Sequence, residues 1–280
     1  MKTRVITGVV AGGLFIAMFF LLYTWVYPIM LAAFAAIGVW EIEKAVGLKN
    51  KPIMILSLAV SAAIPFVVHF HLCLPLLAII SLYCIAVLVL MLAEFEKTRF
   101  EHAAIAIFAS LAVPYALSCM LALRDVYEKY PGVYTKADGV FLILFGLFCA
   151  WMTDTFAFFV GSKFGKHKMC LKISPKKSVE GAIGGVVGAA LLNVILLAVF
   201  KKFFSGAESS LSYIGVVLVS VLLSVISMLG DLAASTIKRN YGIKDFGKIF
   251  PGHGGVMDRA DSVSFVLPTL YAVITLINYC

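Results

Sequence analysis

Charged residues are scarce in this chain of 280 residues: only 14% are Asp, Glu, Lys or Arg, whereas 62% are hydrophobic. Soluble domains carry about 25% charged and about 45–50% apolar residues. The composition therefore excludes an ordinary soluble domain, a disordered chain and a coiled coil. The apolar runs also lack the alternation of apolar and polar residues that a transmembrane barrel requires. The class that remains is a polytopic membrane protein built of α-helices.

Two motifs with known chemistry are also missing. The six cysteines form no Cys-x-x-Cys pair and most lie in apolar runs, which argues against a zinc site and a disulfide framework. There is no Gly-x-Ser-x-Gly sequence, so a serine hydrolase is disfavoured.

The formal net charge of the chain is +8, which would suggest a nucleic-acid partner in a soluble protein. In a membrane protein it indicates basic cytoplasmic loops instead, and we predict no nucleic-acid partner.

Long apolar runs are what the sequence has in abundance. A helix needs about 20 apolar residues to span a bilayer, and nine runs meet or approach that length. We therefore predict an all-α bundle of about nine transmembrane helices. Their approximate bounds are 5–22, 24–40, 53–69, 72–93, 103–123, 139–161, 180–200, 211–235 and 262–279.

The basic residues are distributed unevenly between these runs. Of the 23 Lys and Arg residues, 18 lie at the N-terminus and in every second connection, namely 41–52, 94–102, 162–179 and 236–261. Because basic loops remain in the cytoplasm, we predict a cytoplasmic N-terminus and an outside C-terminus. The chain then divides into five N-terminal spans, 1–138, and a C-terminal region, 139–280, that carries the two most basic cytoplasmic loops.

Asp154 is a charged residue inside a predicted span that is otherwise uncharged. A carboxylate there costs on the order of 2.5–3.5 kcal/mol on insertion scales. A contact with a cation or substrate would explain it, and so would a structural pair with a nearby lysine. Asp154 and Glu180, the latter at the start of the span predicted at 180–200, are both secondary candidates for the site. The intervening loop presents Ser174, Lys176 and Lys177 at a predicted helix start, where free backbone N–H groups also favour an anion.

The second basic loop is richer in candidate residues. Asp231, Ser235 and Lys238 are four and three residues apart, so they share one face if the helix continues. Carboxylates suit Mg²⁺, basic side chains suit phosphate oxygens, and glycines let the backbone approach a phosphate. The pattern predicts a site for a metal-bound polyphosphate. The candidates are Asp231, Ser235, Lys238, Arg239, Lys244, Asp245, His253, Gly254, Gly255, Asp258, Arg259 and Asp261.

The stretch from Ser235 to Asp261 reads S-T-I-K-R-N-Y-G-I-K-D-F-G-K-I-F-P-G-H-G-G-V-M-D-R-A-D. It resembles the signature of the phosphatidate cytidylyltransferase (CDP-diacylglycerol synthase) family, S-x-x-K-R-x-x-x-x-K-D-x-x-x-x-x-P-G-H-G-G-x-x-D-R-x-D, at every fixed position. The resemblance implies a multi-pass enzyme of phospholipid biosynthesis that uses CTP, phosphatidate and Mg²⁺. It implies a catalytic region at 139–280, surrounded by membrane lipids and facing the cytoplasm from the bacterial inner membrane.

The resemblance also suggests a role for each candidate. Asp231 and Asp258 would bind Mg²⁺, with Asp261 as a further ligand or a support, and a second cation such as K⁺ can share the site. His253 would orient or protonate the leaving pyrophosphate. The groups expected to hold the triphosphate or the lipid phosphate are Lys238, Arg239, Lys244, Arg259, Ser174, Lys176 and Lys177.

Two other functions remain open from the sequence. A CTP-dependent kinase of polyprenols or other lipids would use the same nucleotide, and an organic-anion transporter would also combine an intramembrane carboxylate with basic loops. A transporter should carry polar residues toward both membrane faces. This chain gathers them on one, which favours the enzyme. The preferred acyl chains and the formation of a homodimer are left undecided.

Overall fold

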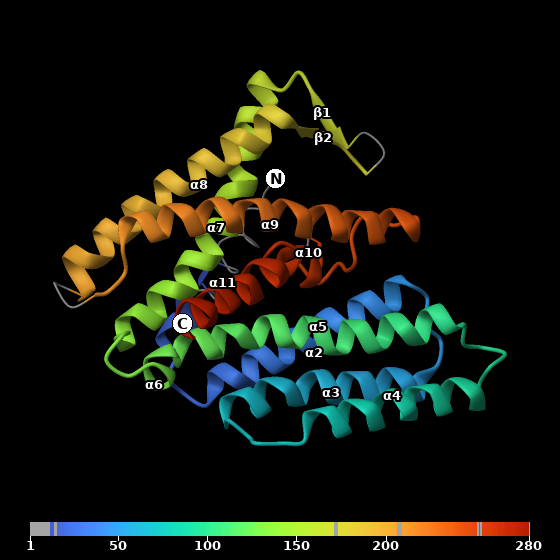
Figure 1. The fold of residues 1–280 in the computed structure, drawn as a ribbon. Coiled ribbons are helices and arrows are strands. Elements are labelled where there is room, and N and C mark those ends of the chain that lie inside the picture. The colour runs from blue at the N-terminus through green and yellow to red at the C-terminus, as the bar shows by residue number, and fades with distance from the viewer. Residues whose placement is uncertain are drawn as a thin grey trace. The chain divides into compact units, whose positions relative to one another are not determined.

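Helices dominate the computed structural model, which describes residues 12–13, 16–170, 173–205, 209–250, 252 and 254–279 (Figure 1). Seven of the described helices are long and apolar enough to cross a membrane, and the 15-residue α11 is a shorter apolar helix. The predicted class, a polytopic all-α membrane protein, is therefore confirmed. Half of the first predicted span, 5–22, lies outside the described residues. The total of nine spans and the orientation of the termini stay predictions.

The chain folds as two compact units, and the first combines the residues up to Leu121 with Asn240–Ala260. It contains α2 (Val26–Ala45), α3 (Lys51–His69), α4 (Leu76–Ala93), most of α5 (Phe100–Arg124) and the short α10 (Met257–Ala260). Asn50, the N-cap residue of α3, connects three segments of this unit by hydrogen bonds. Its side-chain oxygen accepts a hydrogen bond from the Ile53 N–H at 3.1 Å, and its amide donates to the Leu90 carbonyl at 3.1 Å and the Thr98 hydroxyl at 3.0 Å.

One predicted boundary in the first unit was wrong. The loop expected at 41–52 begins later, because α2 continues to Ala45. Glu41 and Glu43 fall within the range predicted as a loop, yet both are buried on the helix. Glu43 is stabilised there by the Ser57 hydroxyl of α3, which donates a hydrogen bond to its Oε1 at 2.5 Å. A partner on another helix thus makes it possible for the carboxylate of Glu43 to be buried on α2.

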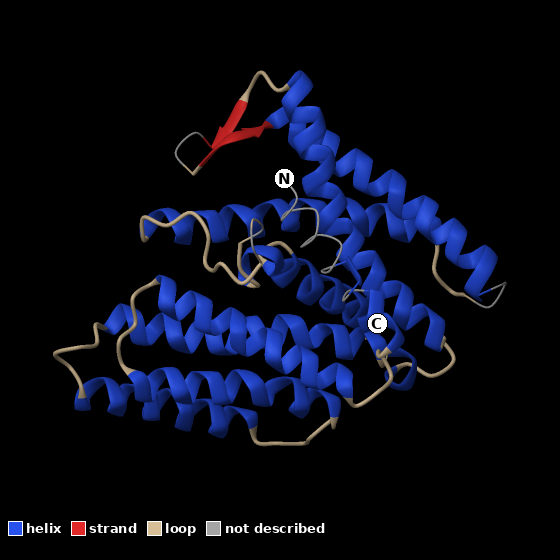
Figure 2. Ribbon diagram, turned by 180° about the vertical axis from the view of Figure 1, so that it is seen from behind, coloured by secondary structure: helices blue, strands red, loops and turns tan. Residues whose placement is uncertain are grey.

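The second unit combines Ala122–Arg239 with the residues from Asp261 onward. Its elements, in chain order, are α6 (Val126–Lys129), α7 (Lys136–Phe164), β1 (Lys168–Cys170), β2 (Ser174–Ser178), α8 (Val179–Phe200), the π-helical turn η1 (Lys201–Ser205), α9 (Tyr213–Asn240) and α11 (Val263–Ile277). β1 and β2 form an antiparallel pair, and they are the only two strands among the described residues (Figure 2).

Glycines let α7 and α8 approach closely on either side of this hairpin. A Cβ atom at Gly181 would lie 2.7 Å from the Ala157 carbonyl oxygen, and one at Gly185 would lie 2.8 Å from the Thr153 carbonyl oxygen. Small residues permit such contacts between membrane helices. The helix start predicted at 174–181 is corrected here. Residues 174–178 form a strand, and Ser178 caps α8 by accepting a hydrogen bond from the Gly181 N–H at 3.2 Å.

Buried hydroxyls connect α9 to both of these helices. The Thr153 hydroxyl of α7 donates to Ser224 Oγ at 2.9 Å, and the Asn193 amide of α8 donates to Ser220 Oγ at 3.1 Å. Ser220 and Ser224 precede Asp231 by eleven and seven residues, which places all three on one face of α9. Hydrogen bonds between membrane helices contribute roughly 0.6–2 kcal/mol each, so they help to fix the rotation of α9 about its axis.

The predicted topology can be tested with a reporter enzyme that is active only outside the cytoplasm. Fused after Cys280, the reporter should be active. Inserted between β1 and β2, it should be silent, because that hairpin belongs to the most basic connection and basic connections remain inside. Reporter activity measured in intact cells, normalised to the amount of fusion protein, decides the question. The reverse pattern would refute both the orientation and the placement of the basic loops in the cytoplasm.

Candidate active site

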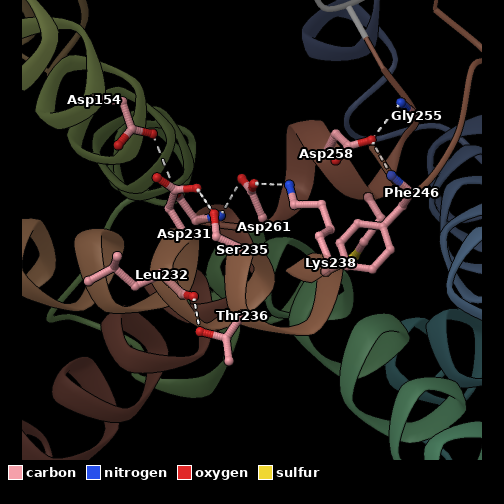
Figure 3. A network of polar contacts seen from close by, with 12 residues as sticks. Asp154, Asp231, Leu232, Ser235, Thr236, Lys238, Phe246, Gly255, Asp258 and Asp261 are labelled. Carbon is pink, nitrogen blue, oxygen red and sulfur yellow. Dashed lines mark hydrogen bonds and ion pairs between the residues drawn. The ribbon is translucent and has the colours of Figure 1, made fainter. Parts of the chain in front are cut away.

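Asp231 lies at the centre of a polar cluster in the second unit (Figure 3). Its Oδ2 forms an ion pair with Lys177 Nζ at 2.5 Å, and its Oδ1 accepts a hydrogen bond from Ser235 Oγ at 3.5 Å. The side chains of Asp231 and Lys177 are 26% and 23% exposed. The pair is therefore largely withdrawn from water, and Lys177 Nζ itself is buried. Asp231 and Ser235 share one face because α9 continues to Asn240 rather than ending near residue 235.

Two more carboxylates point toward this cluster from other elements (Figure 3). Asp154, on α7, accepts a hydrogen bond from the Ser262 hydroxyl at 3.2 Å, and Asp261 accepts one from the Ser262 N–H at 2.8 Å. Lys238 Nζ lies 3.9 Å from Asp261 Oδ2. Burial, and after it the charge of Asp231, raises the pKa of Asp261 to about 7. When they are ionised, the three carboxylates of Asp154, Asp231 and Asp261 outnumber the two lysines, Lys177 and Lys238, and this excess of negative charge favours the binding of a cation.

Asp258 belongs to the first unit, where it organises the glycine-rich loop. Its Oδ2 accepts hydrogen bonds from the backbone N–H groups of Phe246 at 2.8 Å, Gly255 at 3.0 Å and Gly247 at 3.4 Å. Gly254 has a φ angle of 85°, a conformation that strains any residue with a Cβ atom. The sequence did not predict this structural role. The role predicted for Asp258, as a ligand of Mg²⁺, stays a prediction.

The other predicted residues differ in exposure. Lys176 is exposed on β2, and because neighbouring side chains of a strand alternate, it points away from the side that Lys177 occupies. His253 lies outside the described residues, and its role in orienting pyrophosphate stays a prediction. Exposed side chains also belong to Arg239 in the second unit and to Lys244, Asp245 and Arg259 in the first.

Glu180 has a structural explanation. Its Oε1 lies 2.6 Å from His167 Nδ1, and its carboxylate also accepts hydrogen bonds from the backbone N–H groups of Lys166 and His167. These contacts tie the end of α7 to the start of α8 around the hairpin. Glu180 therefore connects the two segments that flank the hairpin, and Lys177 lies between them on β2.

Sequence reasoning overlooked two residues. Ser262 is 3% exposed and contacts both Asp154 and Asp261; its only indication in the sequence is its place directly after the signature. Glu41 accepts a hydrogen bond from the Met257 N–H at 2.9 Å. Glu41 falls within the connection predicted at 41–52, and only the fold shows that it contacts a segment more than 200 residues later.

Comparisons with known proteins agree with the signature. A family model described as "Cytidylyltransferase family" matches residues 2–277. A protein of Staphylococcus haemolyticus (strain JCSC1435) named phosphatidate cytidylyltransferase is 40% identical over 156 residues, which are 55% of this chain and 57% of that protein. One of the same name from Bacillus subtilis (strain 168) is 33% identical over 290 residues, 99% of each chain. The match thus spans little more than half of the first relative and nearly all of the second.

Proposed function

The chain belongs to the cytidylyltransferase family, as the signature predicted, and we propose that it transfers the cytidylyl group of CTP to phosphatidate. The products are CDP-diacylglycerol and pyrophosphate. The observation that carries this proposal is the cluster of carboxylates and lysines around Asp231, near the end of a long apolar helix. Such a place suits a reaction in which one substrate keeps its acyl chains in the membrane and the other arrives from water.

The reaction is an in-line displacement at phosphorus. A phosphate oxygen of phosphatidate forms a bond to the α-phosphorus of CTP, and the bond from that phosphorus to the oxygen bridging to the β-phosphorus breaks. The electron pair leaves with pyrophosphate. No covalent intermediate with the protein is needed, so catalysis consists of positioning the two phosphates and neutralising their charge.

The lysines of the cluster supply much of that neutralisation. Lys177 pairs with Asp231 and Lys238 lies beside Asp261, so two ammonium groups border the carboxylates. Phosphate oxygens offer these ammonium groups an equivalent anionic partner. The remaining basic residues of the signature and of the hairpin are further candidates to bind the triphosphate or the lipid phosphate. They are Arg239, Lys244, Arg259 and Lys176, and the hydroxyl of Ser174 is a candidate as well.

The donor set fits Mg²⁺. Within the described residues no group of three acidic, His or Cys side chains could hold a metal ion by itself. Mg²⁺ ordinarily needs fewer, because it keeps several waters and is bound by one or two carboxylates together with substrate phosphates. We propose Asp231 as a ligand, Asp261 as a further ligand or a support and, on the signature alone, Asp258 as a second ligand. When bound, Mg²⁺ supplies charge neutralisation at the phosphate oxygens. A second cation such as K⁺ fits the same excess of negative charge.

The distribution of basic residues supports a cytoplasmic active site in the bacterial inner membrane. Both loops that contribute to the predicted site, 162–179 and 236–261, are among the most basic connections of the chain. CTP would reach the site from the cytoplasm, and phosphatidate would enter sideways from the membrane. A CTP-dependent lipid kinase would also use this arrangement, so the identity of the acceptor must be tested directly.

The purified protein, given labelled CTP, phosphatidate and Mg²⁺, should form CDP-diacylglycerol and pyrophosphate in equal amounts. Replacing CTP by ATP, omitting phosphatidate or adding a chelator should abolish both products. Thin-layer chromatography of the lipid and a pyrophosphate assay measure them in parallel. Release of CDP with phosphorylation of a polyprenol would support the kinase instead. Movement of anions across sealed vesicles without nucleotide turnover would support the transporter.

A further inference from the structure

Glu41 is a buried carboxylate of the first unit that the proposed reaction does not use. It lies on α2, a helix long and apolar enough to span the membrane, and it is 1% exposed. Its Oε2 accepts a hydrogen bond from the Met257 N–H at 2.9 Å. A buried carboxylate is costly unless polar groups compensate it. The compensating group seen here comes from the glycine-rich loop of the signature.

The loop closes around Glu41 from two sides. Gly247 and Gly255 approach so closely that a Cβ atom at either position would overlap the Glu41 carboxylate. Glycine is needed at both positions for this reason, independently of any ligand. Oε1, the oxygen closest to Gly247, is buried and has no hydrogen-bond partner among the described residues. The carboxylate is thus enclosed by the loop rather than directed at solvent.

Asp258 holds the same loop by other backbone groups. It accepts hydrogen bonds from the N–H groups of Phe246, Gly247 and Gly255, while Glu41 accepts that of Met257. Residues 246–257, which we term the glycine loop, are therefore fixed by two carboxylates. These hydrogen bonds lie near the two ends of the loop. Backbone groups held in this manner at both ends of the loop are positioned before a ligand arrives, which reduces the entropy lost on binding.

We propose that Glu41 is a positioning residue for the glycine loop and that, through it, Glu41 sets the affinity for CTP. The proposal rests on the proposed function, in which this loop binds the triphosphate. Glu41 touches neither nucleotide nor lipid; it acts by holding the loop backbone. Glu43 provides a matched comparison, because it is equally buried two residues later on α2 and its carboxylate accepts a hydrogen bond from Ser57 of α3 instead.

The test compares three variants of the full-length protein by equilibrium binding of CTP and by steady-state kinetics. Glu41→Ala should weaken CTP binding and raise KM for CTP by about tenfold, since a buried N–H loses its acceptor, while KM for phosphatidate stays unchanged. Glu41→Gln keeps an acceptor oxygen and should recover most of the affinity. Glu43→Gln should bind CTP like the parent protein. Unchanged CTP affinity in a folded Glu41→Ala protein would overturn the proposal.

A pair of variants tests the contact itself, and does so even if Glu41→Ala folds poorly alone. Gly247→Ala places a methyl group against Glu41 and should weaken CTP binding. Combining it with Glu41→Ala removes the overlap, so the double variant should bind CTP more tightly than Gly247→Ala does. A double variant no better than Gly247→Ala would count against the proposal. A parent protein that binds CTP without forming CDP-diacylglycerol would refute the proposed function while leaving this inference standing.

Discussion

Asp231→Asn should lower turnover per folded molecule by roughly a hundredfold or more, since each 1.36 kcal/mol added to the barrier is about a factor of ten in rate. Asparagine keeps the shape of the side chain and removes its charge. The variant would lose the negative ligand for Mg²⁺ and leave Lys177, 2.5 Å away, without its partner. Turnover measured across a Mg²⁺ titration, with folded protein quantified separately, should show a weaker and incomplete response to the metal.

The control is Glu101→Gln in the first unit. It removes an exposed ion pair with Arg99 at 3.2 Å, and exposed pairs contribute little to stability, so turnover should stay within about a factor of two. If Asp231 only stabilises the fold through Lys177, Asp231→Asn would lower the melting temperature instead. The surviving protein would then turn over at a near-normal rate with unchanged Mg²⁺ dependence, and the assignment of Asp231 as a metal ligand would be wrong.

The second large effect is expected for Asp258→Ala. The substitution removes the acceptor of three backbone N–H groups, and each buried N–H left without a partner costs about 1–3 kcal/mol. The glycine loop should lose its order, and the specificity constant for CTP should fall by roughly a hundredfold. Steady-state kinetics with varied CTP measure the loss, and limited proteolysis of the loop reports its order.

Asp258→Asn separates the two roles of this residue. The amide oxygen can still accept hydrogen bonds from the loop, so proteolysis should be close to that of the parent protein. If Asp258 also binds Mg²⁺, turnover should nevertheless stay low, because the amide carries no charge. If both properties recover, Asp258 organises the loop and does not bind the metal. An Asp258→Ala protein with nearly normal kinetics for CTP would contradict both roles.

The helices could be predicted because their cause is local. A run of about 20 apolar residues is a helix in a membrane whatever surrounds it, and the expected runs at 53–69 and 103–123 lie within α3 and α5. The common face of Asp231 and Ser235 also follows from helical spacing alone. Lys238 continues that face, and in the structure it lies beside Asp261. Spacing along one helix was sufficient for this part of the site.

The features of the site that could not be predicted depend on partners distant in the sequence. The basic stretch around Lys176 and Lys177 fits a strand as well as a helix start, and only the pairing of β2 with β1 decides which lysine turns toward Asp231. Glu41 resembles a loop residue until Met257 is placed beside it. Ser262 is one serine among many until Asp154 is near. Short-range periodicity in the sequence gives no information about contacts between distant segments.

The buried hydroxyls of α9 also bear on how the chain assembles. A hydroxyl in a lone membrane helix can bond to a carbonyl of the preceding turn, as Thr236 does with Leu232 at 2.8 Å. Helix α9 can therefore enter the lipid singly with its hydroxyls satisfied. Ser220 and Ser224 gain their side-chain partners only when α8 and α7 dock. Membrane insertion of α9 and formation of the site are then separate stages. The carboxylates and lysines of the Asp231 cluster come together only in the second stage, when the helices pack.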